Sequence, residues 1–283
     1  MVGARRRRRI VLGAALALAA ALVWWLKGPA HGAAQAPWRA RGYLVAGVPL
    51  WLPPLSAPGH GGGWVGLAPT LARQVANAAL GNPGRVHLLP LEPGQRAWAV
   101  RTGAADLVVA GVTAGGAAAA PAGTRLVGPY LVTPLALMVR RGHPVRTWTE
   151  LDGSEVGVLA GRAALRKAVG PHTSYVVEAQ EMPGLAVRGL ALGRLRAIVG
   201  PLPVLRALAG YDPQLAVQTE SALGVERFWV LVPDGSNALV PAIERAIATL
   251  PTGAALTQAL DRWASEVALP GPRPLLTLPS GPA

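Results

Sequence analysis

The chain contains no cysteine among its 283 residues. This absence excludes disulfide bonds, thiolate metal sites, a cysteine nucleophile and a lipid-modified cysteine at a mature N-terminus. The five histidines are isolated, and none has a second histidine or an acid at the spacing that metal ligands use. We therefore expect neither a metal site nor a cofactor.

Acidic residues are also scarce, with 14 Asp and Glu against 27 Lys and Arg. Six of the bases precede Pro37, and the 21 bases and 14 acids that follow give that part a net charge of +7. These bases are scattered, without a basic helix or interleaved aromatic residues, which argues against a nucleic-acid partner. No close pair of carboxylates favours a two-carboxylate mechanism.

The glycine-rich stretch from His60 to Gly66 matches two sequence motifs that occur in enzymes. His60–Gly63 (HGGG) matches an esterase oxyanion loop, but the chain has no G-x-S-x-G nucleophile turn to accompany it. Gly61, Gly63 and Gly66 also match a dinucleotide-binding spacing, but they lie about a dozen residues beyond the preceding strand. We expect a turn between a strand and a helix, and no enzymatic activity.

The first 36 residues are typical of an export signal. Five arginines, Arg5–Arg9, precede the apolar run Ile10–Leu26, and the small and polar segment Lys27–Ala36 follows. The apolar run has 17 residues, the lower limit for a membrane span. Pro37 follows a possible Ala-x-Ala cleavage site and should hinder cleavage. Residues 1–36 are thus predicted to be a signal peptide or a membrane anchor, with the remainder in the periplasm or on the extracytoplasmic face.

From Tyr43 onward, hydrophobic patterns of strands and helices alternate, which predicts an α/β fold with parallel strands. The first half contains strands at Tyr43–Val48, Val86–Leu91 and Asp106–Val112, with helices at Leu67–Leu80 and Gln95–Arg101. The pattern restarts after Tyr130, with strands at Leu135–Val139, Val156–Leu159, Tyr175–Val177, Ala197–Val199 and Phe228–Val232 and helices at Arg162–Val169, Leu185–Leu192, Val204–Ala209, Leu239–Leu250 and Ala254–Ala264. Beyond Val267 the tail is rich in proline.

Candidate ligand-binding residues follow two of the strands. Gly111 and Thr113 end the strand that begins at Asp106, where open α/β sheets usually hold ligands. Trp51 and Trp64 lie in or beside the Pro49–Gly63 loop after the first strand, and a loop position favours a place in the wall of a cleft.

The order of these segments resembles the family 3 extracellular solute-binding proteins of amino-acid uptake systems. Eight stretches carry the resemblance, among them Gly42–Pro54 (GYLVAGVPLWLPP), Arg101–Thr113 (RTGAADLVVAGVT), Gly128–Tyr130 (GPY), Leu151–Gly161 (LDGSEVGVLAG), Leu192–Val204 and Arg227–Gly235. It implies a two-lobed type II periplasmic binding fold. Residues 40–131 and 230–266 would form lobe 1 and residues 134–227 lobe 2, joined by two hinge strands near Tyr130–Pro134 and Phe228–Val230, with 267–283 as a tail.

The resemblance also shows what is missing. Relatives that bind amino acids carry an arginine for the carboxylate and an aspartate for the ammonium group, and the corresponding positions here are Ala118 and Pro201. Burying a zwitterion without both partners is costly. Arg162, at the start of a predicted helix of lobe 2, is the replacement that we expect to contact an anion. Arg96 is a weaker candidate.

The sequence therefore predicts a monomeric, exported solute-binding protein that takes a small polar or anionic solute, not a typical α-amino acid, and delivers it to the permease of an ABC transporter. The alternative is an accessory or sensory protein that keeps the clamp fold with a degenerate ligand site, as a partner of another periplasmic complex.

Overall fold

A computed structural model describes residues 36–110, 120–159, 175–178, 183–219 and 223–268 of the chain. The part from Trp38 onward forms one compact unit. The helices are α2 (Pro37–Arg41), α3 (Leu67–Leu80), α4 (Arg96–Thr102), α6 (Pro183–Ala191), α7 (Leu202–Gly210), α8 (Val240–Ala248) and α9 (Gly253–Glu266), with 3₁₀ turns η1 (Pro93–Gln95) and η3 (Trp148–Leu151). The strands are β1 (Leu44–Pro49), β2 (Ala57–Pro58), β3 (Trp64–Val65), β4 (Val86–Leu91), β5 (Leu107–Ala110), β6 (Thr124–Arg140), β7 (Glu155–Val158), β8 (Tyr175–Glu178), β9 (Ala197–Pro201), β10 (Leu215–Gln218) and β11 (Val225–Pro233).

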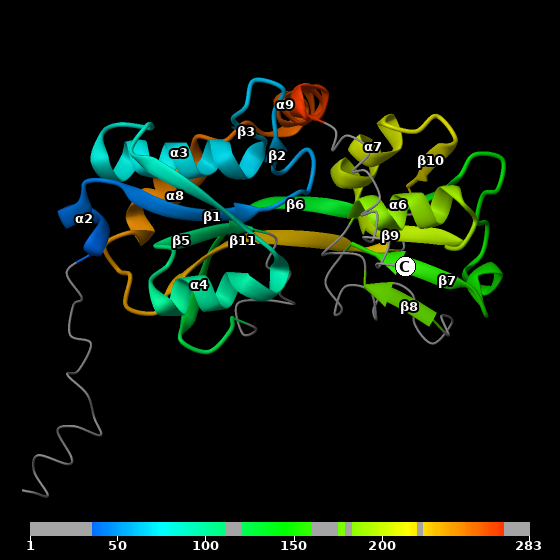
Figure 1. The fold of residues 1–283 in the computed structure, drawn as a ribbon, viewed down its shortest axis with the longest axis horizontal. Coiled ribbons are helices and arrows are strands. Elements are labelled where there is room, and N and C mark those ends of the chain that lie inside the picture. Colours follow the sequence, from blue (N-terminus) through cyan, green and yellow to red (C-terminus); the bar gives the residue numbers. More distant parts are fainter. Residues whose placement is uncertain (1–35, 111–119, 160–174, 179–182, 220–222, 269–283) are drawn as a thin grey trace, which may run out of the picture. The chain divides into compact units, whose positions relative to one another are not determined.

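One mixed sheet runs through the described residues in the order β4-β1-β5-β11-β6-β9-β7-β8, and β10 pairs with β6 (Figure 1). Strands β4, β1 and β5 are parallel to one another, and so are β9, β7 and β8. Between these groups, β11 and β6 pair antiparallel. The mixed α/β sheet with two strands joining its halves confirms the predicted fold class; the proposed limits of the two lobes remain a prediction.

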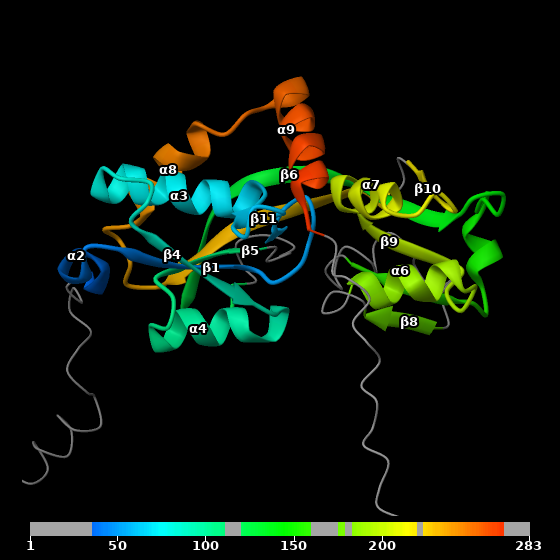
Figure 2. The same cartoon turned by 45° about the horizontal axis from the view of Figure 1, so that its top comes forward.

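Helix α3 has the bounds that the sequence predicts, because its two ends are marked by local signals. Gly66 precedes it with φ +122°, and Gly81 ends it in the left-handed conformation and donates its N–H to the Asn77 carbonyl. The helix buries Leu71 and Val75 on the face that the apolar spacing indicates. Figure 2 shows α3 and α8 on one face of β1, β4 and β5, and α4 on the other.

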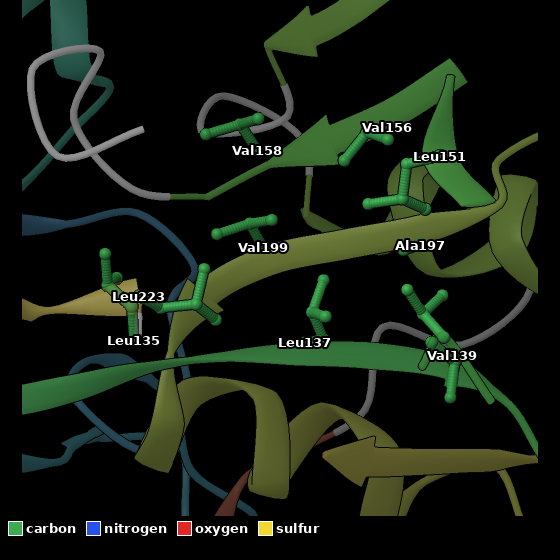
Figure 3. Close-up of a cluster of buried hydrophobic side chains, with 10 residues drawn as sticks. Leu135, Leu137, Val139, Leu151, Val156, Val158, Ala197, Val199 and Leu223 are labelled. Atoms are coloured by element: carbon green, nitrogen blue, oxygen red, sulfur yellow. The ribbon is translucent and has the colours of Figure 1, made fainter. Parts of the chain in front are cut away.

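The described helices and strands bury two apolar clusters that fix the sheet on either side of the β6–β11 pair. One cluster joins β4, α4, β5 and β11 through residues such as Leu91, Val100 and Leu231. The other lies on one face of the neighbouring strands β6, β9 and β7, and Figure 3 shows its side chains gathered beside these strands. Its labelled members are Leu135, Leu137, Val139, Leu151, Val156, Val158, Ala197, Val199 and Leu223.

The structure differs from the sequence prediction at several places. The strand predicted at Leu135–Val139 is the last third of β6, which is 17 residues long. The loop Pro49–Gly63 contains β2 of the β2–β3 hairpin, and it is held by the end of α9, since His60 donates its N–H to the Glu266 carbonyl. Strand β10, which has only one buried residue, was not anticipated.

Helix α2 was also not anticipated. It follows the predicted leader directly and is anchored by Trp38, which is buried, and by Arg41. Within the described residues, no helix combines the length and the apolar character that a membrane crossing requires. The predicted leader lies outside the described residues.

Candidate functional site

The strand registers bring the carboxyl ends of six strands to one place. The end of β5 lies opposite β11 at Ala110 and Trp229, and β9 ends opposite β6 at Pro201 and Leu135. Since β1 and β4 are parallel to β5, and β7 and β8 are parallel to β9, all six strands run toward the stretch where β6 and β11 pass from one half to the other. This is the edge at which open α/β sheets hold ligands.

Three of the five predicted site residues fall outside the described residues. Gly111 directly follows the last residue of β5, and Thr113 comes two residues later; Arg162 follows β7. Their sequence positions put all three after carboxyl ends of converging strands. Their role in binding stays a prediction.

Trp51 lies on the loop after β1 and reaches toward the other half of the sheet. Its indole ring lies 4.0 Å from the position that a β-carbon on Gly184 would occupy, in the first turn of α6. Trp64 is half-buried in β3, where its carbonyl accepts a hydrogen bond of 3.1 Å from Arg73. Trp64 does not line either of the two described cavities that border the converging strands.

Arg96 and Trp51 both line a cavity of about 20 Å³ between the β1 loop and η1. Loss of water around its guanidinium lowers the pKa of Arg96 to about 10, and the nearby Tyr130 opposes this change. The side chain therefore stays charged at neutral pH. Glu92 also lines the cavity, but its carboxylate caps η1 by accepting the N–H of Gln95.

Tyr130 is buried on β6, with its ring centroid 6.2 Å from that of Phe228 on β11. Burial raises the pKa of Tyr130 far above its usual value, and the Arg96 charge counteracts this only in part. Its hydroxyl consequently remains protonated. Among the described residues, this hydroxyl finds no hydrogen-bond partner, although it has almost no contact with solvent.

Two indole N–H groups are likewise buried without a hydrogen-bond acceptor. Trp51 and Trp229 both have buried Nε1 atoms without an acceptor in the described part of the chain. Trp229 lies at the irregularity where the β6–β11 register shifts, and its ring packs against Gly128, which has φ +118°. Tyr130, Trp51 and Trp229 therefore each bury a hydrogen-bond donor that has no acceptor among the described residues. We call these three residues the donor cluster.

Sequence reasoning named Trp51 as a site residue but missed Tyr130 and Trp229. Tyr130 was assigned only to a hinge, and a tryptophan in a strand is usually packing. It also missed Glu226, which is 2% exposed on β11 opposite Thr133 and makes an interaction of its own. An acid inside an apolar strand was the signal that could have indicated it.

A larger cavity of about 460 Å³ lies between α7, α9 and residues 131–134 of β6. Exposed Arg206 and Asp261 border it from opposite helices, and the Tyr211 hydroxyl donates to the Ala264 carbonyl at 3.2 Å to join α7 with α9. In the described ranges, no group of three His, Cys, Asp or Glu side chains is placed to hold a metal ion.

Comparison with known proteins shows that the chain matches the model of one protein family. Residues 44–266 match the family model of bacterial extracellular solute-binding proteins, family 3. No curated protein matches the chain.

Solved structures share the fold. One is a solute receptor for L-cysteine of Neisseria gonorrhoeae, with 21% identity over 80% of this chain and 92% of that one and a TM-score of 0.67. Another is a periplasmic binding protein from Brucella ovis with glutathione bound. It has 21% identity over 76% of this chain and 70% of that one, and a TM-score of 0.66. A third is the substrate-binding protein AbpA from Streptococcus pneumoniae bound to L-arginine. It has 19% identity over 81% of this chain and 98% of that one, and a TM-score of 0.66.

Proposed function

Because the chain belongs to the family 3 bacterial extracellular solute-binding proteins, we propose that it captures a small polar or anionic solute and presents it to the permease of an ABC transporter. The convergence of six strand ends on the β6–β11 pair is the observation that supports this proposal most directly. A solute bound there would contact both halves of the sheet, and closure around it would shift the population toward a clamped form.

The division into lobes belongs to this proposal. Residues 40–131 and 230–266 would move as one lobe and residues 134–227 as the other, with β6 and β11 acting as the hinges. Trp51, Trp64, Gly111, Thr113 and Arg162 would line the solute site. Trp51 has the strongest structural support, because its ring already reaches α6 in the other half.

The solute is proposed to differ from those of the structural neighbours, which bind L-cysteine, L-arginine and glutathione. Ala118 and Pro201 occupy the positions where amino-acid-binding relatives have the arginine and aspartate that grip the two charges of the solute. An α-amino acid would leave its charges without these partners. We propose that the protein binds the solute without converting it.

The place of action follows from the family and the leader. An extracellular binding protein works outside the cytoplasm, and residues 1–36 would direct export and then be removed or remain as an anchor. Sequencing the N-terminus of the exported protein distinguishes the two cases, since an intact Met1 means an anchor.

The experiment is a thermal-shift screen of the full exported protein against a broad panel of metabolites. A solute at one hundred times its Kd stabilises the folded state by about 2.7 kcal/mol. An Arg162→Ala variant of the protein should then bind the solute that is found more weakly. If no metabolite shifts the transition, the transport function is wrong.

A second function is favoured by the two missing anchors at Ala118 and Pro201. The protein would keep the clamp fold as an accessory or sensory partner of a periplasmic complex. Isolation of a stable membrane complex with the protein, together with a metabolite screen without any shift, would support this function over transport.

A further inference from the structure

Helices α7 and α9 border the cavity of about 460 Å³ beside residues 131–134 of β6, and one hydrogen bond joins their carboxyl ends. We propose that this bond, from the Tyr211 hydroxyl to the Ala264 carbonyl, is a strap that favours the arrangement of the lobes in which Trp51 lies against α6, and so regulates closure around the solute. The proposal rests on the solute-binding function and the lobe limits given above, which place α7 in one lobe and α9 in the other.

The acceptor of the strap is available because α9 ends two residues after Ala264. The last four carbonyls of an α-helix have no donor within the helix, and α9 ends at Glu266. The N–H of Ala268, which a longer helix would offer to Ala264, donates to the Pro58 carbonyl at 2.9 Å. This bond fixes the end of α9 to β2 in the proposed lobe 1 and leaves the Ala264 carbonyl to Tyr211.

The donor of the strap is fixed to the other half of the sheet. Tyr211 directly follows α7, and its backbone N–H donates to the Leu208 carbonyl at the end of that helix. Helix α7 buries Val204, Leu205 and Leu208 and packs on β6, β9 and β10. Burial raises the pKa of Tyr211, so its hydroxyl stays protonated and able to donate at neutral pH.

Both helices border the part of β6 where the first hinge is expected. Residues 131–134 line the cavity and pair with residues 225–228 of β11. Val132 is 51% exposed there, an unusual position for a large apolar side chain within a strand. Figure 2 shows α9 beside α7 along β6. Because the two helices belong to different lobes, bending of β6 at this place must change the space between them.

The cavity shows that α7 and α9 do not interlock. Packed protein interiors contain few voids larger than a water molecule, whereas these helices enclose about 460 Å³. Arg206 and Asp261 border the cavity from opposite helices, but in the part of the chain that the structure describes no ion pair joins them. A single hydrogen bond changes an equilibrium by about two- to tenfold, so the binding energy of a solute can override it.

The strap coexists with a contact at the proposed solute site. The Trp51 ring lies 4.0 Å from the position of a β-carbon on Gly184, which joins the β1 loop to α6 in the same arrangement of the lobes. Loss of the Tyr211 hydroxyl therefore lowers the population of this arrangement without removing a group that contacts solute. Such a shift in population changes the apparent affinity for any solute that binds between the lobes.

The test measures the distance between the lobes in the full exported protein without solute. The chain has no cysteine, so cysteines introduced at Asn77 on α3 and Arg188 on α6, both exposed, carry the only two nitroxide labels. Pulsed electron paramagnetic resonance then gives the distribution of label distances. We expect Tyr211→Phe to raise the ratio of a second distance to the main one by about fivefold. A distribution identical to that of the parent would overturn the strap.

Two controls distinguish hinge motion from local change. Tyr43→Phe makes the same substitution in lobe 1, where the ring of Tyr43 lies 4.4 Å from that of His87, and it should leave the distribution unchanged. A label pair at Asn77 and Trp98, on helices that cover opposite faces of lobe 1, should keep one distance in Tyr211→Phe. A change in this second pair would show that the hydroxyl acts within lobe 1, and would contradict the proposal.

The outcomes separate this inference from the solute-binding function. If a metabolite in the broad screen binds and Tyr211→Phe leaves the distances unchanged, the strap is wrong and the solute-binding function stands. If Tyr211→Phe shifts the distances but no metabolite binds, the strap is supported and the solute-binding function is wrong.

Discussion

The Arg41 guanidinium donates a hydrogen bond of 2.5 Å to the Asp106 carboxylate and so links α2 to the residue that precedes β5. The same carboxylate oxygen accepts the backbone N–H of Val45 in β1 at 2.7 Å. Asp106 is buried, whereas about a third of the Arg41 side chain is exposed. One carboxylate therefore holds three elements together at the amino ends of the central strands.

Replacing Asp106 with Asn should destabilise the fold by about 2 kcal/mol, because it removes the charge that both donors use. Chemical denaturation of Asp106→Asn and of the parent measures this directly. The matched control is Glu150→Gln, since the ion pair of Glu150 with Arg196 is longer, at 3.8 Å, and partly exposed. We expect the control to change stability by less than about 1 kcal/mol. Equal effects of the two substitutions would contradict the role given to Asp106.

Gly66 permits a close approach between the start of α3 and the loop before it. A β-carbon there would lie 2.5 Å from the Leu55 carbonyl oxygen, and the backbone has φ +122°. Gly66→Ala should therefore destabilise the protein by about 2 kcal/mol or more. Gly61→Ala is the control, since a β-carbon at Gly61 would meet nothing within 4 Å. The difference in denaturation midpoint between the two variants tests whether the backbone contact at Gly66 is obligatory.

Tyr130 should make stability fall at alkaline pH. Its pKa is raised in the folded state, so the stability that its protonated hydroxyl contributes is complete below pH 10 and is lost as the pH rises above that value. Arg96 acts in the opposite direction, because its lowered pKa of about 10 makes the unfolded state bind more protons between about 10 and 12.5. The Tyr130→Phe variant should accordingly lose less stability than the parent between pH 9 and 11. Absorbance of tyrosinate near pH 11 should also be unchanged by the substitution, since Tyr130 is not yet ionised there.

Tyr211 connects α7 to α9 beside the larger cavity. Tyr211→Phe removes the hydrogen bond to the Ala264 carbonyl, and because this bond is only partly buried, we expect a loss of about 1 kcal/mol. Thermal denaturation measures the change. A loss no greater than that of Tyr43→Phe, whose hydroxyl makes no hydrogen bond to a described residue, would show that the bond does not contribute to stability.

The elements that the sequence predicted well are those with local signals. Helix α3 begins and ends at the residues expected, because Gly66, Pro69 and Gly81 specify its ends without help from distant parts of the chain. Strand β4 was also predicted with its observed bounds. The fold class followed from the resemblance of ordered segments to a known family, whose model covers residues 44–266.

The features that the sequence did not predict depend on distant contacts. The β2–β3 hairpin region is held by the N–H of His60 and the carbonyl of Pro58, which bond to the end of α9 about 200 residues later. The length of β6 depends on pairing with β11 and β9 on either side. Whether the Tyr130 hydroxyl has a partner is likewise decided by tertiary packing, so no pattern in the sequence could reveal the donor cluster.

Strand β6 belongs to both halves of the sheet, since β11 covers its first two thirds and β9 and β10 its last third. Any cut that separates the halves must break this ladder or leave one strand with exposed backbone N–H and carbonyl groups. Such edges recruit strands from other molecules. Isolated fragments of either half are therefore expected to aggregate, and domain exchange with a relative would have to transfer β6 and β11 together.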